Sequence, residues 1–213
     1  MTARSSPIGP AEPRGPSPRL LDLFCGAGGA AIGYHRAGFE VVGVDIDPQP
    51  NYPFEFHQAD AMTFPLDDFD AIHASPPCQH YTPVTRWRGS SGDHPDLYDR
   101  TLTRLLDSNA VWAIENVPHA PFTPDVVLCG SMFGLPIRRH RWFIGSPSLL
   151  PWVQPCTHRS TDLAFDHGGT TSTESEYRDA MGCDWMTVKE SRQAIPPAYT
   201  EWIGGQLLAH VGV

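Results

Sequence analysis

The chain has 213 residues and a formal net charge of −9. That length suits one domain with a small appendage. The apolar runs fall short of the roughly 18 residues that a membrane-spanning helix needs, and residues 1–19, rich in Pro, Ser, Gly and Arg, lack the apolar core of a secretory signal. We therefore expect a disordered leader over 1–19, a cytoplasmic location and no membrane partner.

Cysteines are spread singly along the chain, at positions 25, 78, 129, 156 and 183. The odd count and the lack of close pairs argue against a disulfide framework and favour a reducing compartment. Cys156 and His158 are of the types that bind zinc, but no second pair stands at the usual spacing from them. Because this second pair is missing from the sequence, we expect no metal site.

The first elements are predicted to form a strand–helix–strand unit. Residues 20–24 are an apolar run typical of a buried parallel strand, residues 30–37 have a helical pattern, and residues 40–44 form a second strand that ends on Asp45. Between the first strand and the helix, residues 25–29 include three glycines, which let a backbone turn tightly and approach a ligand. A tight strand-to-helix turn without a ligand would explain these glycines as well.

The chain continues to alternate strands and helices up to residue 145, and one more helix is predicted near its end. Strands are predicted at 54–58, 69–73 and 110–115, a late hairpin at 126–128 and 142–144, and helices at 97–106 and 197–210. Such alternation predicts an α/β fold with a doubly wound, mostly parallel sheet. Residues 146–180 are rich in Pro, Ser, Thr, Gly and His without periodicity, which predicts a very small loop-rich insert.

Reactive side chains follow several of the predicted strands. Asp45, Asp60, Cys78 and Glu115 each stand at or just beyond a strand's carboxyl end. Because these ends meet at one edge of a parallel sheet, a nucleotide-like ligand would lie over the glycine turn and the two aspartates, facing the thiol and the other carboxylate. Cys78 ends a stiff Pro-Pro loop that leaves it little backbone freedom. A buried packing role is the competing interpretation for this cysteine.

Five motifs, in this order, resemble those of the DNA (cytosine-5)-methyltransferase family. They are Asp22-Leu-Phe-Cys-Gly-Ala-Gly-Gly29, Ser75-Pro-Pro-Cys-Gln79, Glu115-Asn-Val117, Arg139-His-Arg141 and Gln193-Ala-Ile-Pro-Pro197. The resemblance covers 20–145 and about 181–210. It implies a Rossmann-like class I methyltransferase with a cofactor-binding and catalytic domain at 20–145, a reduced recognition insert at 146–180, and a segment at 181–213 that returns to the catalytic domain.

The resemblance implies transfer of a methyl group from S-adenosylmethionine to carbon 5 of a cytosine flipped out of duplex DNA. Cys78 would be the nucleophile that adds to carbon 6, and Glu115 would bind or protonate ring nitrogen 3, for which a raised pKa is needed. Arg141 would contact the base oxygen and orient Glu115 or Cys78. Arg139 would support the same region or bind a phosphate.

The resemblance also implies which residues bind S-adenosylmethionine. Phe24 and Ile46 would pack on the adenine, Asp45 would bind the ribose hydroxyls and Asp60 the adenine amino group. The full set of candidates is Phe24, Gly26, Gly28, Asp45, Ile46, Asp60 and Pro77. Ordinary core packing stays open for Ile46, and a helix N-cap stays open for Asp60.

The chain departs from the family in its recognition region, where only residues 146–180 stand. Base readout needs side chains that reach groove edges. So short an insert predicts relaxed specificity, a partner subunit for recognition, or a substrate other than duplex DNA. Two alternatives stay open: the same chemistry on cytosine in RNA or in a free nucleotide, and a catalytically idle DNA- or cofactor-binding protein. Trp87, between Arg86 and Arg88, would cover the site, stack on a base, or belong to a plain surface loop. Restriction–modification is the biological role that the resemblance suggests.

Overall fold

The computed structural model describes residues 16–81, 87, 95–164 and 174–212. Most of the expected leader lies outside the described residues, as do Arg86 and Arg88. Among the helices of the described part, none is long and apolar enough to span a membrane.

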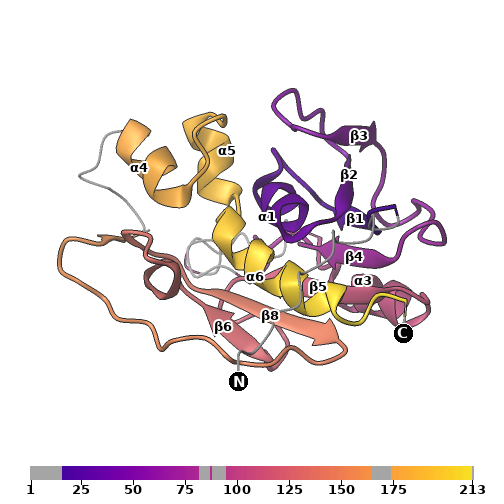
Figure 1. Cartoon of the computed structure of the whole chain (residues 1–213). Coiled ribbons are helices and arrows are strands. Elements are labelled where there is room, and N and C mark those ends of the chain that lie inside the picture. The colour runs from indigo at the N-terminus through magenta and orange to yellow at the C-terminus, as the bar shows by residue number, and fades with distance from the viewer. Residues whose placement is uncertain (1–15, 82–86, 88–94, 165–173, 213) are drawn as a thin grey trace, which may run out of the picture.

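The centre of the molecule is a seven-stranded sheet with the order β3-β2-β1-β4-β5-β8-β6 (Figure 1). The strands are β1 (Arg19–Leu23), β2 (Glu40–Asp45), β3 (Glu55–Gln58), β4 (Ala71–Ala74), β5 (Val111–Asn116), β6 (Val126–Leu128) and β8 (Arg141–Ser146). Strands β1 to β5 pair in parallel, and β8 runs antiparallel to both of its neighbours. The predicted α/β class, the mostly parallel sheet and the pairing of the late strands are confirmed.

Helices cover both faces of this sheet, and two hydrophobic cores lie between. On one face α1 (Gly29–Ala37) and α6 (Pro197–Leu208) lie side by side (Figure 1), and Leu20 packs in that core. On the other face α3 (Tyr98–Leu106) packs over Leu21 and Leu23. Because successive side chains of a strand point to opposite faces, the apolar run of β1 serves both cores, which is typical of a parallel strand.

Helices α1 and α6 approach each other closely at a glycine. A Cβ on Gly33 would lie 2.1 Å from both the carbonyl oxygen of Pro197 and Oγ1 of Thr200. The Thr200 hydroxyl in turn donates a hydrogen bond to the carbonyl of Ala30, at 2.9 Å. The end of the chain is thus packed directly on the helix that follows the glycine-rich turn, and α6 begins at Pro197 as predicted.

Several short elements were not predicted from the sequence. They are the 3-10 helix η2 (Gly130–Phe133), β7 (Ile137–Arg138), β9 (Leu163–Ala164), α4 (Glu174–Met181) and α5 (Val188–Gln193). Strand β9 pairs with β7, and α4 begins inside the segment 146–180 that was expected to be loop-rich. Elements this short are stabilised by tertiary partners rather than by local pattern. The capping box of α5, formed by Thr187 and Glu190, was the one available sequence signal.

Candidate active site

The glycine-rich turn after β1 has an unusual backbone. Gly26 and Gly28 have φ of 49° and 85°, and Phe24, which is not a glycine, has φ of 60°. A Cβ on Gly28 would lie 2.7 Å from Cδ of Pro53, whereas nothing lies within 4 Å of a Cβ placed on Gly26. The turn is therefore packed on its Gly28 side and open at Gly26. A non-glycine residue in the left-handed region is characteristic of ligand-binding turns.

Asp45, the last residue of β2, is connected to this turn through its carboxylate. Oδ2 accepts a hydrogen bond from the Gly26 backbone N–H at 2.9 Å, and Oδ1 accepts one from the Asp47 N–H at 3.0 Å. A carboxylate has further lone pairs, so both oxygens keep acceptor capacity for hydroxyl donors. The neighbouring Ile46 is 68% exposed, which argues against the core-packing interpretation. An exposed isoleucine beside a carboxylate and an open glycine turn fits the adenosine part of a cofactor.

Asp60 follows β3 and begins a turn. Its Oδ1 accepts a hydrogen bond from the Met62 N–H at 2.8 Å, and its carbonyl accepts from the N–H groups of Thr63 and Phe64. The structure therefore favours the capping role that the sequence left open. A contact from its second carboxylate oxygen to a cofactor stays a prediction.

The loop that carries Cys78 is attached to the strands on both sides of β4. The Ser75 N–H donates to the Leu23 carbonyl of β1 at 3.2 Å, and the buried amide of Asn116 at the end of β5 donates to the Pro76 carbonyl at 3.0 Å. Pro77 and Cys78 are half-buried at the sheet edge that this loop crosses. Asn116 directly follows Glu115, so the loop and the candidate carboxylate are positioned by the same strand end.

Glu115 is buried on β5 and forms an ion pair with Arg141 of β8, with 2.8 Å between Oε1 and Nε. Burial raises the pKa of the Glu115 carboxyl, opposed by the charges of Arg141 and Arg139 and by a hydrogen bond from Ser75. Burial likewise raises the pKa of the Cys78 thiol, opposed by Arg141, with Glu115 adding to the rise. These mutual effects place the thiol, carboxyl and guanidinium in one electrostatic environment. The direction for Glu115 agrees with the raised pKa that the sequence analysis required.

A buried hydrogen-bond chain leads from α1 to the start of the loop that carries Cys78. The Tyr34 hydroxyl lies 2.9 Å from Nδ1 of His73, and Nε2 of His73 lies 2.7 Å from the Ser75 hydroxyl. Burial lowers the pKa of His73 to about 3, so its ring is neutral at pH 7. Sequence reasoning missed this chain, because Tyr34 lies far along the sequence from His73.

Arg139 takes the supporting role, which was one of the two roles expected for it. Its side chain is only 2% exposed, and its guanidinium donates to the carbonyls of Arg192 and Ala194 at 2.8 Å and to the Tyr177 hydroxyl at 3.2 Å. A head group buried in this way is not placed to bind a phosphate. We therefore correct its assignment from catalytic to positioning: Arg139 joins the segment before β8 to α4 and α5.

The sequence argument against a metal site also needs correction. Cys156 and His158 do have a second pair, because Cys129 and His140 lie beside them in space.

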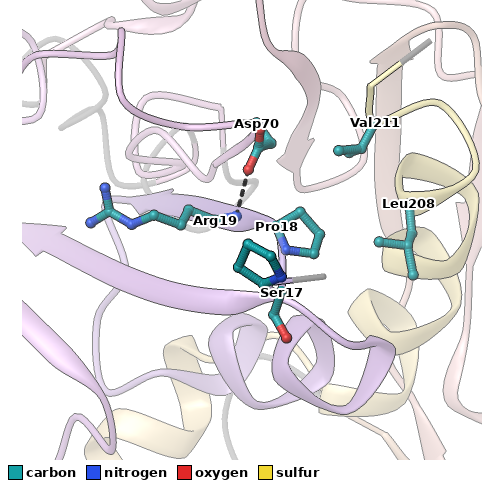
Figure 2. A pocket seen from close by; sticks show the side chains of 7 residues that line it. Ser17, Pro18, Arg19, Asp70, Leu208 and Val211 are labelled. Carbon is teal, nitrogen blue, oxygen red and sulfur yellow. Dashed lines mark hydrogen bonds between the residues drawn. The ribbon is translucent and has the colours of Figure 1, made fainter. Parts of the chain in front are cut away.

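A separate hollow of about 510 Å³ lies at the other end of the strands (Figure 2). It is lined by Pro18, Leu208 and Val211 among others, and the Arg19 N–H donates to Oδ2 of Asp70 across it at 2.7 Å. Arg19 begins β1, so the hollow is at the amino edge of the sheet. Its lining offers no thiol and no glycine turn, and we assign the site to the carboxyl edge instead.

Comparisons with known proteins match part of the chain to methyltransferases. Residues 19–119 match the model of the C-5 cytosine-specific DNA methylase family. An uncharacterized methyltransferase of Synechocystis is 29% identical over 101 residues, which is 43% of this chain and 48% of that protein. The type II methyltransferase M.FnuDI of Fusobacterium nucleatum is 30% identical over 99 residues, 42% of this chain and 29% of that protein. The matches thus span about half or less of these relatives' lengths.

Solved structures show the same fold over nearly the whole chain. The methyltransferase EhMeth of Entamoeba histolytica superposes with a TM-score of 0.60 at 11% identity, covering 93% of this chain and 100% of that one. The Dnmt2 methyltransferase of S. pombe superposes with a TM-score of 0.57 at 15% identity, covering 92% and 99%. The fold is that of class I S-adenosylmethionine-dependent methyltransferases.

Proposed function

We propose that this protein methylates carbon 5 of cytosine in DNA through a covalent Cys78 adduct, with S-adenosylmethionine as the methyl donor. The match of residues 19–119 to the model of the C-5 cytosine-specific DNA methylase family supports this proposal. The observation that carries the proposal is that the loop bearing Cys78 is bonded to the strand end that carries the buried Glu115–Arg141 pair. The Asn116 bond to the Cys78 loop and the 2.8 Å ion pair together hold a nucleophile, an acid and a cation at one sheet edge.

Cys78 forms the bond to carbon 6 of the ring. Burial raises the pKa of its thiol, so the free protein holds it mainly protonated at pH 7. The positive charge of Arg141 opposes that rise and stabilises the thiolate that reacts. Once the sulfur–carbon bond forms, the ring's electron pair moves toward nitrogen 3, and carbon 5 becomes an enamine-type nucleophile.

Glu115 donates a proton to ring nitrogen 3 and later takes it back. Burial raises the pKa of its carboxyl, which favours the protonated form that can donate to the ring. The contact with Arg141, 2.8 Å between Nε and Oε1, orients the carboxyl. After methyl transfer a base, which we take to be water, removes the carbon 5 proton. The carbon–sulfur bond then breaks and Glu115 regains its proton.

The residues of the glycine turn fit the cofactor. When bound, S-adenosylmethionine supplies an electrophilic methyl group. The open space beside Gly26, the acceptor capacity of Asp45 and the exposed side chain of Ile46 suit a methionine chain, a ribose and an adenine respectively. Phe24, Gly28, Asp60 and Pro77 complete the set that we propose for this site.

Duplex DNA is the first choice of substrate because it is the substrate named by the family that the chain matches. The net charge of −9 and the short insert favour a second candidate, the same chemistry on cytosine in RNA or a free nucleotide. If the substrate is DNA, a partner subunit that supplies base recognition is consistent with the small insert. Restriction–modification is the corresponding biological role.

The test is transfer of labelled methyl from S-adenosylmethionine to duplex DNA, RNA and cytidine nucleotides in parallel. We expect label at carbon 5 of cytosine in DNA. Label only in RNA or nucleotide would contradict the DNA assignment and keep the mechanism. Bound cofactor without any transfer would favour an idle binding protein or a missing partner.

A second experiment tests the covalent step directly. DNA that contains 5-fluorocytosine should form a denaturation-resistant adduct, because fluorine cannot leave carbon 5 as a proton does. We expect the adduct with the unmodified chain and its loss in Cys78→Ala, with Cys183→Ala as the matched cysteine control. An adduct that survives in Cys78→Ala would remove this residue from its role.

A further inference from the structure

The antiparallel pairing of β6 and β8 brings together Cys129 and His140, which are eleven positions apart in the sequence. In that register Val127 pairs with Trp142 and Leu128 with Arg141. The next position therefore places Cys129 opposite His140. Cys129 is fully buried with an extended backbone at the start of η2, and His140 lies between β7 and β8.

The insert after β8 supplies a second pair. Sγ of Cys129 lies 3.4 Å from Nε2 of His158, and Sγ of Cys156 lies 3.8 Å from Nε2 of His140. One potential ligand atom from each of the four residues falls within 4.8 Å of every other. The two imidazole rings are inclined at 74° with centroids 5.1 Å apart, so they do not stack. Two separate Cys–His contacts would not require all four atoms to converge on one point.

Two sulfur–nitrogen distances in this cluster match those of a tetrahedral metal site. With Zn–S of about 2.3 Å and Zn–N of about 2.0–2.1 Å, the sulfur–nitrogen edge of a tetrahedron is about 3.6 Å. The two sulfur–nitrogen distances that we observe, 3.4 and 3.8 Å, lie on either side of that value. Two thiolates and two imidazoles in tetrahedral array are a donor set typical of zinc.

We propose that Cys129, His140, Cys156 and His158 bind one zinc ion and form a structural site that fastens the insert to the β6–β8 edge. Four protein ligands leave no open coordination position, which is the arrangement of structural rather than catalytic zinc. The proposal does not depend on methyl transfer.

Hydrogen bonds around the four proposed ligands support a preformed metal site. The Ser131 hydroxyl lies 3.7 Å from Sγ of Cys129, to which it donates, and it accepts a hydrogen bond from the Thr157 backbone N–H at 3.2 Å. Ser131 therefore links the ligand on η2 to the residue between the two insert ligands. Such outer contacts orient metal ligands and hold them in place.

A bound zinc ion would give the insert the stability that it does not gain from apolar burial. Between β8 and α4 the described residues form one strand of two residues, β9, and the large side chains of Leu150 and Trp152 are exposed. Of this segment's large apolar side chains, Leu149 is buried, and Val153 and Leu163 only pack against the cores in part. Such limited burial stabilises a segment weakly, and a metal is a common substitute for a core. His140 directly precedes Arg141, so the same ion would also hold the segment that carries the Glu115 partner.

The first measurement is the metal content of the tag-free full chain by mass spectrometry, after purification and after addition of zinc and dialysis. We expect about one zinc ion per chain, falling below about a tenth of that in His158→Ala and in Cys156→Ser. His210→Ala, an exposed histidine outside the cluster, is the matched control and should keep its zinc. Because His158 is exposed, its variant should fold even where loss of a buried ligand would not.

The second measurement is the visible spectrum of the cobalt(II)-loaded chain. Tetrahedral coordination with two thiolates should give intense d–d bands and a thiolate charge-transfer band, both lost in Cys156→Ser. Removal of zinc by a chelator should lower the Tm of the unmodified chain and leave that of His158→Ala unchanged. A metal-free chain that takes up no zinc, or a Cys129–Cys156 disulfide with only three titratable thiols of the five cysteines, would overturn the proposal.

Discussion

The central sheet has two sides, the strands β1 to β5 and the strands beyond β5, and these are stabilised in different ways. Around β1 to β5 most buried side chains are apolar, and Leu21, Ile72 and Ile114 are fully buried, although Asp22 and His73 are fully buried there as well. Beyond β5 the largest fully buried side chain is that of Arg139, whose guanidinium bonds carbonyls from a distant segment. Asp125 similarly accepts from the N–H groups of Gly145 and Leu149, at 3.0 and 3.1 Å.

This difference teaches where each side is vulnerable. Apolar burial is non-directional and tolerates volume-conserving changes. A buried polar contact is directional, and removing one partner leaves the other desolvated and unpaired. The candidate active site lies where the two sides meet, with Cys78 and Glu115 from the apolar side and Arg141 from the polar side. The effects of substitutions on the two sides should therefore be detected by different measurements.

The largest effect is expected for Cys78→Ala, which removes the nucleophile and leaves the glycine turn intact. Methyl transfer should fall by about 10⁴-fold or more, because no other group forms the bond to carbon 6. Cofactor affinity, measured by calorimetry, should change by less than about twofold, since the thiol is not part of the proposed cofactor site. Substantial residual transfer would contradict the proposed mechanism.

Arg139→Met should cause the largest loss of stability on the polar side. The change leaves the carbonyls of Arg192 and Ala194 buried without their donor, at a cost of about 3–5 kcal/mol in the free energy of unfolding. Urea unfolding measures this loss, and Arg138→Met at the exposed neighbouring position is the control. Equal stabilities for the two variants would mean that the carbonyls find other partners.

Gly33→Ala tests close packing on the apolar side. Its Cβ would lie 2.1 Å from the Pro197 carbonyl, so α6 must shift, and we expect a loss of about 1–3 kcal/mol. Gly205→Ala in α6 is the matched control, because nothing lies within 4 Å of its Cβ and helix propensity should stabilise it by up to about 1 kcal/mol. If both variants shift stability in the same direction, the contact between α1 and α6 is looser than described.

Asp45→Ala should weaken cofactor binding more than it weakens folding. Loss of a charged acceptor for the ribose hydroxyls should raise the Kd for S-adenosylmethionine by about 10- to 100-fold. Asp45→Asn is the conservative control, because it keeps an acceptor for the Gly26 N–H and should lose less affinity. An unchanged Kd in Asp45→Ala would mean that other residues bind the ribose.

The smallest effect concerns the pKa of Cys78, which couples the two sides. Burial raises this pKa, so the thiolate fraction at pH 7 should be below that of an ordinary thiol and should increase as the pH rises toward the raised pKa. The charge of Arg141 opposes the rise, so Arg141→Gln should move the midpoint of Cys78 alkylation to higher pH. Mass spectrometry of the Cys78 peptide measures this midpoint. A downward shift would mean that Arg141 does not stabilise the thiolate.

Local pattern predicted the parts of the fold that neighbouring residues decide. The strands β1, β2 and β5 and the helix α1 are continuous apolar or helical runs, and each lies within one or two residues of its predicted bounds. Their parallel arrangement follows because strands alternate with helices. Prediction failed for β7, β9 and α4, which are too short to have a clear period and depend on partners far along the chain.

The sequence by itself determined the α/β class, the family motifs and the set of chemical groups at the carboxyl edge, because each depends on adjacent residues. Only the tertiary structure decided that Arg139 bonds buried carbonyls, that His73 joins Tyr34 to Ser75, and that Cys129 and His140 face Cys156 and His158. These contacts depend on strand register and on how segments fold back over one another, and linear spacing does not record either. The hydrophobic effect assembles the sheet from apolar runs that the sequence shows directly. Directional bonds between residues from distant segments then hold the part of the molecule beyond β5.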